Sequence, residues 1–261
     1  MATKLYTMPG SHPGAAVALA LERKGIPYRR IDVMMPASLL TIRLRGFHGR
    51  TVPALKIGRK RFQGSVEICR ALERLEPEPP IYPADPDQRR RVEIAESWGD
   101  EVLQPAARRI NVWGMTRDHA PVARQIVDSR ELYDANIMIP APLAAALAGP
   151  MLSWYSRAIG ADDDRVHHDL AELPSMLEGV DTWIREGVLG GAEPNAADFQ
   201  IASSVRLMMT MEDLREPLSV RPAGRLALRL LPRYPGHSDE VLPEDWLQPL
   251  RAARVVNPGA G

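Results

Sequence analysis

The segment from Val52 to Ser65 has the sequence VPALKIGRKRFQGS, and it decides the fold expected for the first part of the chain. Residues 53–57 and 61–63 are two short strand candidates with a turn, Gly58-Arg59-Lys60, between them, so the segment predicts an antiparallel β-hairpin. After Gly64, Ser65 is a good N-cap, and apolar residues then repeat at helical spacing. The hairpin is therefore expected to lead directly into a helix, whose apolar face comprises Ile68, Leu72 and Leu75.

The residues before the hairpin predict a strand, a helix and a second strand. Lys4–Thr7 is a strand candidate that stops at Pro9-Gly10, and the alanine-rich run Ala15–Lys24 favours a helix closed by a glycine cap. Tyr28–Val33 then predicts a strand, whereas residues 34–50 are expected to be irregular. The predicted order is βαβ followed by ββα, which is an α/β domain.

The rest of the chain predicts helices. Prolines crowd residues 77–86 and remove too many backbone donors for a helix or strand, so a stiff linker is expected there. Only helical patterns follow, including one over Arg90–Trp113, in which Pro105 should kink the helix or mark a break. Asn195–Asp198 is similar to a capping box at the start of a buried helix. Repeated Pro, Gly and Arg beyond Pro217 predict little regular structure. The expected division is an α/β domain at 1–78, a linker at 79–87, an all-helical domain at 88–216 and an irregular C-terminal tail at 217–261.

Composition limits the classes of function. The 261 residues are 45% apolar and 25% charged, which is typical of a soluble globular protein with two unequal domains. Lys plus Arg and Asp plus Glu total 33 each, so no overall charge favours nucleic acid or an anionic membrane, and small-molecule partners are expected. The single cysteine, Cys69, excludes an internal disulfide and any site that needs several thiolates.

The same sequence predicts a cytoplasmic protein without a membrane segment or a metal. Nothing at the N-terminus resembles a signal peptide. The most apolar stretch, Ile137–Tyr155, is interrupted by prolines and a glycine, whereas a membrane span needs ~20 largely uninterrupted apolar residues. The adjacent pair His167-His168 lacks the i, i+4 spacing with which two helical histidines share one metal, so no metal site is expected.

Three positions in the first domain are candidates for a ligand site. Ser11 lies where the loop after the first strand enters a helix, beside backbone N–H groups and the positive end of the helix dipole, which favour a bound thiolate or other anion. Val52-Pro53 precedes a strand, where a cis proline could leave the Val52 backbone free to pair with a peptide-like ligand. Gln63-Gly64-Ser65 is a strand-to-helix turn that could hold a carboxylate. Taken separately, helix capping explains both serines, and an ordinary trans bond explains Pro53.

The segments around these positions resemble the N-terminal domain of glutathione transferases. The resemblance covers roughly residues 3–80, and the capping box at Asn195–Asp198 is similar to one in that family's helical domain. It implies a thioredoxin-like βαβ-ββα domain followed by a helical bundle domain, and it implies a homodimer. The residues that carry it are Lys4–Met8, Ser11-His12-Pro13, Lys24–Tyr28, Thr51-Val52-Pro53 and Ser65–Ile68.

The resemblance also implies roles for single residues. Ser11 would donate a hydrogen bond to the sulfur of glutathione, the co-substrate, and so lower the pKa of its thiol. Val52 would pair through its backbone with the cysteinyl part beside a cis Pro53, and Ser65 with the adjacent helix amides would hold the γ-glutamyl carboxylate. Independently of the resemblance, the position of His12 beside Ser11 could let it act as an acid or base on a substrate, although adjacent side chains more often point away from one another's target. The implied function is a glutathione transferase-like enzyme that activates a thiol for attack on a hydrophobic electrophile.

One residue departs from the family pattern. Family members commonly have an acidic residue or glutamine directly before the helix-capping serine, and here that residue is Gly64. Gln63 could substitute from one position earlier, or the site could take a different low-molecular-weight thiol. A non-catalytic ligand-binding or scaffold protein of the same architecture is the other alternative. A serine at position 11 cannot form a mixed disulfide, so reductase chemistry is disfavoured, and Cys69 is expected to be a packing residue.

Overall fold

The computed structural model describes residues 3–34, 37–135 and 137–255. Its first domain is built on a mixed four-stranded sheet with the strand order β2-β1-β3-β4. β1 (Thr3–Thr7) is parallel to β2 (Arg29–Asp32) and antiparallel to β3 (Ala54–Ile57), which forms the predicted hairpin with β4 (Lys60–Gln63). The sheet confirms the predicted order of βαβ followed by ββα.

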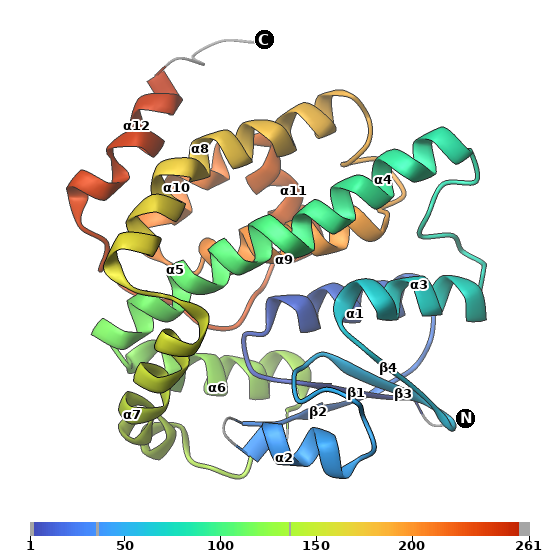
Figure 1. Ribbon diagram of the computed structural model, residues 1–261, viewed down its shortest axis with the longest axis horizontal. Helices are drawn as coiled ribbons and strands as arrows, with labels where there is room; N and C mark the ends of the chain where they lie inside the picture. Colours follow the sequence, from blue (N-terminus) through green and yellow to red (C-terminus); the bar gives the residue numbers. More distant parts are fainter. Residues whose placement is uncertain (1–2, 35–36, 136, 256–261) are drawn as a thin grey trace.

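The helices of the first domain cover both faces of this sheet. α1 (His12–Arg23) and α3 (Ser65–Leu75) lie on the face toward the second domain, and α2 (Ala37–Leu44) lies on the opposite face (Figure 1). The start of α1 and the start of α3 are therefore both close to the boundary between the domains.

Residues 34–50 were expected to be irregular, and this expectation is wrong because α2 forms there. Ile42 and Phe47 are buried in this stretch and pack against Tyr6 and Ala54 of the sheet. The apolar residues of this short helix do not mark its buried face, because Leu40 and Leu44 are 63% and 75% exposed whereas Ile42 is buried. The helix therefore depends on a tertiary contact that a local pattern does not reveal.

The second domain consists of helices, as predicted. A single π-helical turn, η1, interrupts the long helix expected near residues 90–113 and divides it into α4 and α5. The elements in chain order are α4 (Pro86–Trp98), η1 (Gly99–Leu103), α5 (Gln104–Arg117), α6 (Ala120–Tyr133), α7 (Ala141–Ile159), α8 (Asp163–Arg185), α9 (Ala196–Met208), α10 (Glu212–Ser219), α11 (Pro222–Leu230), the short 3-10 helix η2 (Glu244–Leu247) and α12 (Gln248–Val255).

α9 lies at the centre of the molecule, in contact with α1, α4, α5 and α11. It begins with the predicted capping box: Asn195 Oδ1 accepts hydrogen bonds from the N–H groups of Ala197 and Asp198, and the Asp198 carboxylate accepts one from the N–H of Asn195. Nearly every residue of α9 is buried, with Phe199 only 1% exposed. The helix joins both domains in one continuous apolar core.

The C-terminal tail at 217–261 was expected to be irregular, and the described part instead contains α11 and α12. Pro222 and Pro249 stand in the first turns of these helices, where a missing N–H costs no intrahelical hydrogen bond. Leu226 is buried in the common core. The prolines that suggested an irregular chain therefore mark where helices begin.

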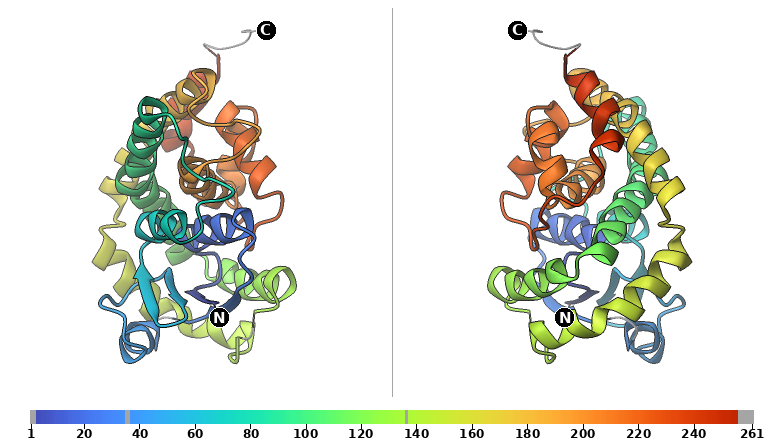
Figure 2. Two further views of the ribbon diagram at one scale, coloured as in Figure 1. Left: turned by 90° about the vertical axis from the view of Figure 1, so that its right-hand side faces the viewer. Right: turned by 90° about the vertical axis from the view of Figure 1, so that its left-hand side faces the viewer.

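The two domains meet along the sheet as well as through α9. Figure 2 shows the sheet at one end of the molecule, with α6 and α7 extending beside it from the helical domain. Among the described residues, no helix has both the length and the apolar character needed to cross a membrane.

Candidate functional site

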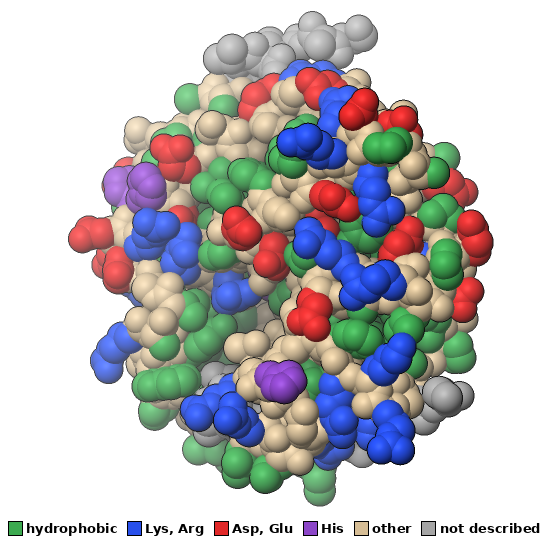
Figure 3. Space-filling model, turned by 45° about the vertical axis from the view of Figure 1, so that its right-hand side comes forward, with side chains coloured by type: hydrophobic (Ala, Val, Ile, Leu, Met, Phe, Trp, Pro, Cys, Tyr) green, Lys and Arg blue, Asp and Glu red, His purple; other side chains and the backbone are tan. Residues whose placement is uncertain are grey.

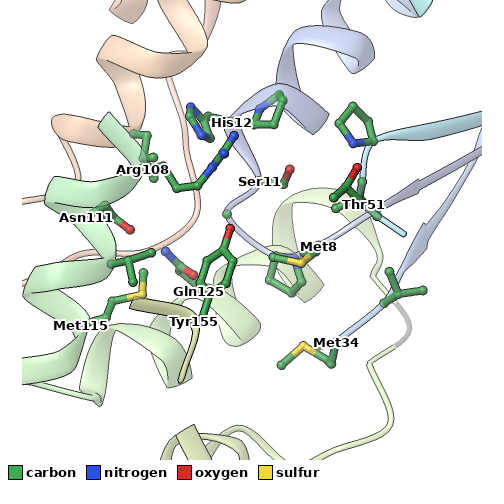
Figure 4. A pocket seen from close by; sticks show the side chains of 18 of the residues that line it. Met8, Ser11, His12, Met34, Thr51, Arg108, Asn111, Met115, Gln125 and Tyr155 are labelled. Atoms are coloured by element: carbon green, nitrogen blue, oxygen red, sulfur yellow. The ribbon is translucent and has the colours of Figure 1, made fainter. Parts of the chain in front are cut away.

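A cavity of about 490 Å³ lies between the two domains. The loop between β1 and α1, the segment 50–53 and the start of α3 form one side, and residues from η1, α5, α6 and α7 form the other (Figure 4). Gln63 is not part of the lining. The predicted site residues that the fold brings together at this cavity are Ser11, His12, Val52, Pro53, Gly64 and Ser65.

Ser11 caps the N-terminus of α1. Its Oγ accepts a hydrogen bond from the N–H of Gly14 at 3.2 Å, and its own N–H donates to the carbonyl of Met8 at 3.1 Å. The oxygen thus acts as an acceptor in the cap, while the hydroxyl proton has no acceptor among the described residues. This proton remains available to a ligand in the cavity.

Two hydrogen bonds from distant residues fix the loop that carries Ser11. Arg30 donates from Nη2 to the carbonyl of Met8 at 3.2 Å, and Tyr234, which is 224 residues further along the chain, donates to the carbonyl of Gly10 at 3.0 Å. Gly14 allows a close approach of α1 to β1, because a Cβ there would lie 2.0 Å from the hydroxyl oxygen of Thr7. The loop is therefore held from β2 and from the C-terminal segment.

The Val52–Pro53 peptide bond is cis, as predicted. The Pro53 carbonyl accepts a hydrogen bond from the N–H of Gly64 at 3.0 Å, which joins this turn to the start of α3. The backbone N–H and carbonyl of Val52 form no hydrogen bond with any described residue. Both groups can therefore pair with an extended ligand in the manner of an added strand.

Gln63 has a structural task outside the cavity. Its side-chain oxygen accepts a hydrogen bond from the N–H of Gly49 at 2.7 Å, and its side-chain nitrogen donates to the carbonyl of Thr51 at 2.6 Å. These bonds hold the loop that precedes Val52. The amide is thereby occupied, which argues against the idea that Gln63 replaces the side chain missing at Gly64.

The start of α3 differs from the expected serine cap. Gly64 is the N-cap, with φ 92° and ψ 142°, and Ser65 is the first helical residue, so the predicted capping role of Ser65 is wrong. A positive φ of this kind is open to glycine and strained for other residues. No side chain in the described part of the chain caps the helix, so its first N–H groups are available to hold an anion.

Ser65 instead contacts the second domain. Its Oγ donates a hydrogen bond to Asp100 Oδ1 at 3.3 Å. Asp100 Oδ1 also accepts hydrogen bonds from the side-chain amides of Gln104 at 2.6 Å and Gln200 at 3.1 Å. Asp100 lies in η1 and lines the cavity. Sequence patterns missed it, because nothing in a continuous helical repeat indicates a π turn that changes which side chains face the site.

His12 is fully buried beside the cavity. Its Nδ1 lies 3.3 Å from Ser204 Oγ on α9, and its Nε2 has no hydrogen-bond partner among the residues that the structure describes. Burial, and secondarily the positive charge of Arg108, lower the pKa of His12 well below its usual value. The imidazole is therefore neutral at neutral pH, which disfavours a role as a proton donor.

The helical domain supplies an apolar wall with a few polar groups. Figure 4 shows Tyr155, from α7, and Gln125, from α6, directed toward the region in front of Ser11. The apolar lining residues of this wall include Val112, Met115, Ile126, Met151 and Leu152. A cavity of this size, in which apolar residues surround a limited set of polar groups, suits a small polar ligand beside an apolar one.

Cys69 lies away from the cavity. It is 2% exposed in the common core, and burial, the largest cause, raises the pKa of its thiol well above the usual value. A buried thiol without a tendency to ionise agrees with the packing role predicted for it.

Comparisons with known proteins agree with this architecture. A family model described as glutathione S-transferase, N-terminal domain, matches residues 5–80. A search of curated protein sequences finds no significant match. Solved structures match at low identity over nearly the whole chain.

Three of these structures indicate the range of the likeness. Glutathione transferase F2 from Populus trichocarpa is 14% identical with a TM-score of 0.58, and the match covers 97% of this chain and 99% of that one. Glutathione S-transferase-I bound with lactoylglutathione is 18% identical with a TM-score of 0.58, covering 97% and 100%. Maleylacetoacetate isomerase from Anaeromyxobacter dehalogenans, with bound dicarboxyethyl glutathione and citrate, is 19% identical with a TM-score of 0.51, covering 100% and 98%. Residues 5–80 therefore match the glutathione S-transferase N-terminal domain model, and the chain as a whole has the glutathione transferase fold.

Proposed function

We propose that this protein is a glutathione transferase-like enzyme that activates the thiol of glutathione for attack on a hydrophobic electrophile. The observation that carries the proposal is the hydroxyl of Ser11, which has a free proton at the N-terminus of α1 and lies in a cavity between the two domains. The first-domain side offers backbone groups for a peptide, and the apolar residues on the helical side offer room for the electrophile.

In the proposed reaction, the thiol loses its proton to solvent and the sulfur forms a bond to an electrophilic carbon, whose leaving group departs with the bonding electron pair. Ser11 donates a hydrogen bond to the sulfur, and the helix N-terminus adds a positive potential. Both effects stabilise the thiolate more than the thiol, so they lower the thiol pKa and raise the fraction of nucleophile near neutral pH.

The peptide part of glutathione fits the groups around Ser11. The free backbone groups of Val52 would pair with the cysteinyl residue, and the uncapped N–H groups of α3 would hold the γ-glutamyl carboxylate. Asp100, at 3.3 Å from the hydroxyl of Ser65, would take the ammonium group of the same γ-glutamyl residue. An anion site and a carboxylate side by side match the two charges of that end of the tripeptide.

The bound ligands of two similar structures support a glutathione-type thiol. One structure holds lactoylglutathione and the other dicarboxyethyl glutathione, and both ligands are glutathione derivatives. We further propose a cytoplasmic homodimer, for which sedimentation velocity on the purified protein is the direct measurement.

The test removes the hydroxyl of Ser11. We expect Ser11→Ala to lower kcat/KM for glutathione conjugation of a generic aromatic chloride roughly tenfold to a hundredfold, because a hydrogen bond to a charged group contributes about 1.5–3 kcal/mol. Ser11→Thr, which keeps a hydroxyl, should retain more activity. Ser175→Ala, at an exposed position of α8, is the matched control and should leave the rate unchanged.

The alternatives give different results in the same assay. Unchanged turnover in Ser11→Ala would refute the role of this hydroxyl. No heat of binding with glutathione in calorimetry, together with tight binding of an apolar dye, would favour the non-catalytic binding protein, for which the glycine at position 64 is the supporting observation. Selective binding of another small thiol would assign the same chemistry to that thiol.

A further inference from the structure

Arg108 places a positive charge in the cavity on the helical side. It lies on α5 and lines the cavity, and Figure 4 shows its side chain extending from α5 toward the loop of Ser11 and His12. Its charge is one of the causes that lower the pKa of His12, which agrees with this closeness. The guanidinium therefore lies inside the cavity, on the side of the helical domain and across from the loop that carries Ser11.

The charge of Arg108 has no carboxylate partner among the described residues. Its one hydrogen bond there is from Nη2 to the side-chain oxygen of Gln104. By contrast, the next residue, Arg109, forms two hydrogen bonds with Asp169, at 2.6 and 2.8 Å. A partly buried guanidinium without a counter-charge is costly to desolvate, and a bound anion offsets that cost.

Gln104 orients Arg108 within the site. The amide of Gln104 donates to Asp100 at 2.6 Å and accepts from Arg108, so the three side chains form a chain of hydrogen bonds at i, i+4 spacing along η1 and α5. An arginine has five N–H donors in a fixed plane, and only one is used by Gln104. The remaining donors can therefore form the paired hydrogen bonds that match a carboxylate.

We propose that Arg108 binds a carboxylate carried by the electrophilic co-substrate, so that the enzyme selects anionic electrophiles. The inference rests on the proposed function and names the substrate class of the same cavity. A carboxylate on the electrophile would anchor its far end at Arg108 while its reactive carbon lies toward Ser11. The apolar wall that includes Met115 would pack against the rest of the molecule.

Glutathione is a weaker candidate than the electrophile for the carboxylate that binds Arg108. The groups that fit its peptide lie on the other side of the cavity, at Val52 and at the start of α3. Arg50 also lines the cavity, on the side of Val52, so it is better placed than Arg108 for a carboxylate of the tripeptide. The position on α5, next to the apolar lining, assigns Arg108 to the second substrate.

The surface around the cavity favours anions independently of Arg108. The chain contains no acidic residue between Asp32 and Glu67. Figure 3 shows many Lys and Arg side chains and few acidic ones over the first domain, in the lower part of the view. Such a surface attracts an anionic molecule toward the cavity that Arg50 borders. The cations of this stretch are Arg43, Arg45, Arg50, Lys56, Arg59, Lys60 and Arg61.

The experiment compares two electrophiles that differ only in charge, para-chloro-meta-nitrobenzoate and the corresponding benzamide. In both, the glutathione sulfur replaces chloride, which leaves with its bonding electrons. We expect Arg108→Met to lower the ratio of kcat/KM for the benzoate to that for the benzamide roughly tenfold to a hundredfold, mainly through the KM of the benzoate. The KM for glutathione should stay unchanged.

Two further variants test whether the effect depends on the geometry of the guanidinium and on the position of the charge. Arg108→Lys keeps the charge without the planar fork and should restore the ratio in part. Arg90→Met removes an equal charge from an exposed position on α4 and should leave the ratio at the wild-type value. Circular dichroism and the melting temperature of each variant exclude a loss of fold as the cause.

The outcomes separate this inference from the proposed function. Turnover of both electrophiles with a ratio that Arg108→Met leaves unchanged would overturn the inference and keep the transferase. If neither electrophile reacts, the proposed function fails, and the inference is then decided by calorimetry with the benzoate alone. In that case, the anion site is supported if the wild-type protein binds the benzoate and Arg108→Met weakens that binding at least tenfold. Equal affinity in the two proteins, or no binding to the wild-type protein, refutes it.

Discussion

Gly64 begins α3 without contributing a side chain. Its φ of 92° is the reason that glycine stands there. Crowding is not the reason, since an added Cβ would meet no atom within 4 Å. The departure from the family pattern at this residue therefore relieves a backbone conformation that other residues adopt only under strain. Any loss of ligand contact at position 64 accompanies a gain in stability.

This explanation predicts opposite effects for two glycine substitutions. Gly64→Ala should lower the free energy of unfolding by roughly 1–3 kcal/mol, since alanine is strained at a positive φ. Gly179→Ala is the matched control, because that glycine lies in the interior of α8, has no atom near an added Cβ and has no positive φ. It should raise the free energy of unfolding by about 1 kcal/mol. Urea unfolding measures both, and equal effects of one sign would contradict the explanation.

The individual residues on the first-domain side of the cavity could be predicted from the sequence because each marks a junction between a strand and a helix or turn. Ser11, Val52, Pro53 and Ser65 all lie at the cavity as expected. The hydrogen-bond partners of these side chains and of Gln63 were harder to predict. Gln63 binds its own loop and Ser65 contacts Asp100, because these partners come from parts of the chain that only folding brings together.

The junction of α4, η1 and α5 shows why a helical pattern does not reveal the groups that a helix presents. The sequence predicts a helix there that is kinked or broken at Pro105, whereas the π turn at Gly99–Leu103 shifts the helical phase before that proline. Gly99 allows close packing on α9, since a Cβ would lie 2.9 Å from a side-chain carbon of Ile201. Asp100, which follows directly, is thereby brought to the cavity.

α4 also carries a buried carboxyl that makes stability depend on pH. Glu96 is 1% exposed and accepts hydrogen bonds from Tyr82 at 2.7 Å and from Arg70 at 3.4 Å. Burial raises its pKa to about 7, and the two hydrogen-bond partners oppose this shift only in part. The folded state therefore disfavours the ionised form of Glu96.

The sign of the effect follows from comparison with the unfolded chain, where the pKa has its ordinary value near 4.5. The contribution of neutral Glu96 is fully present below that value and is lost as the pH rises toward 7. Between these limits, the natural protein should lose on the order of 3 kcal/mol of unfolding free energy relative to Glu96→Gln. Glu93→Gln is the control, because Glu93 forms a surface ion pair with Arg89. Its unfolding free energy should change with pH as that of the natural protein does. The unfolding free energy of each protein is measured by urea unfolding at a series of pH values. The same pH dependence in the natural protein and Glu96→Gln would count against this assignment.

The division into two domains could be read from the order of patterns along the chain, whereas the way they join could not. Regular helices between residues 88 and 214 give clear repeats, and the hairpin is equally local. α2 and the helices after Pro217 were missed because their stability comes from contacts such as those of Ile42 and Leu226 with distant residues. The helical side of the cavity was missed for the same reason, including Arg108 and Tyr155.

Tyr234 tests this long-range joining directly. Tyr234→Phe removes the hydrogen bond to the carbonyl of Gly10, so we expect kcat for glutathione conjugation to fall several-fold while the unfolding free energy falls by only about 1 kcal/mol. Tyr28→Phe removes a hydroxyl that bonds the surface carboxylate of Glu22 and should leave kcat unaltered. An equal kcat in Tyr234→Phe and the natural protein would show that the loop of Ser11 holds its position without this bond.

The hydrogen bond between Tyr234 and Gly10 also has a consequence for how the protein is made. Synthesis proceeds from the N-terminus, and domains generally begin to fold as they leave the ribosome. The first domain emerges early, but the loop of Ser11 lacks one of its two long-range restraints until residue 234 has been added. The nascent chain can thus have a folded sheet before it has a finished site, and Ser11 is fully positioned only after Tyr234 has been synthesised.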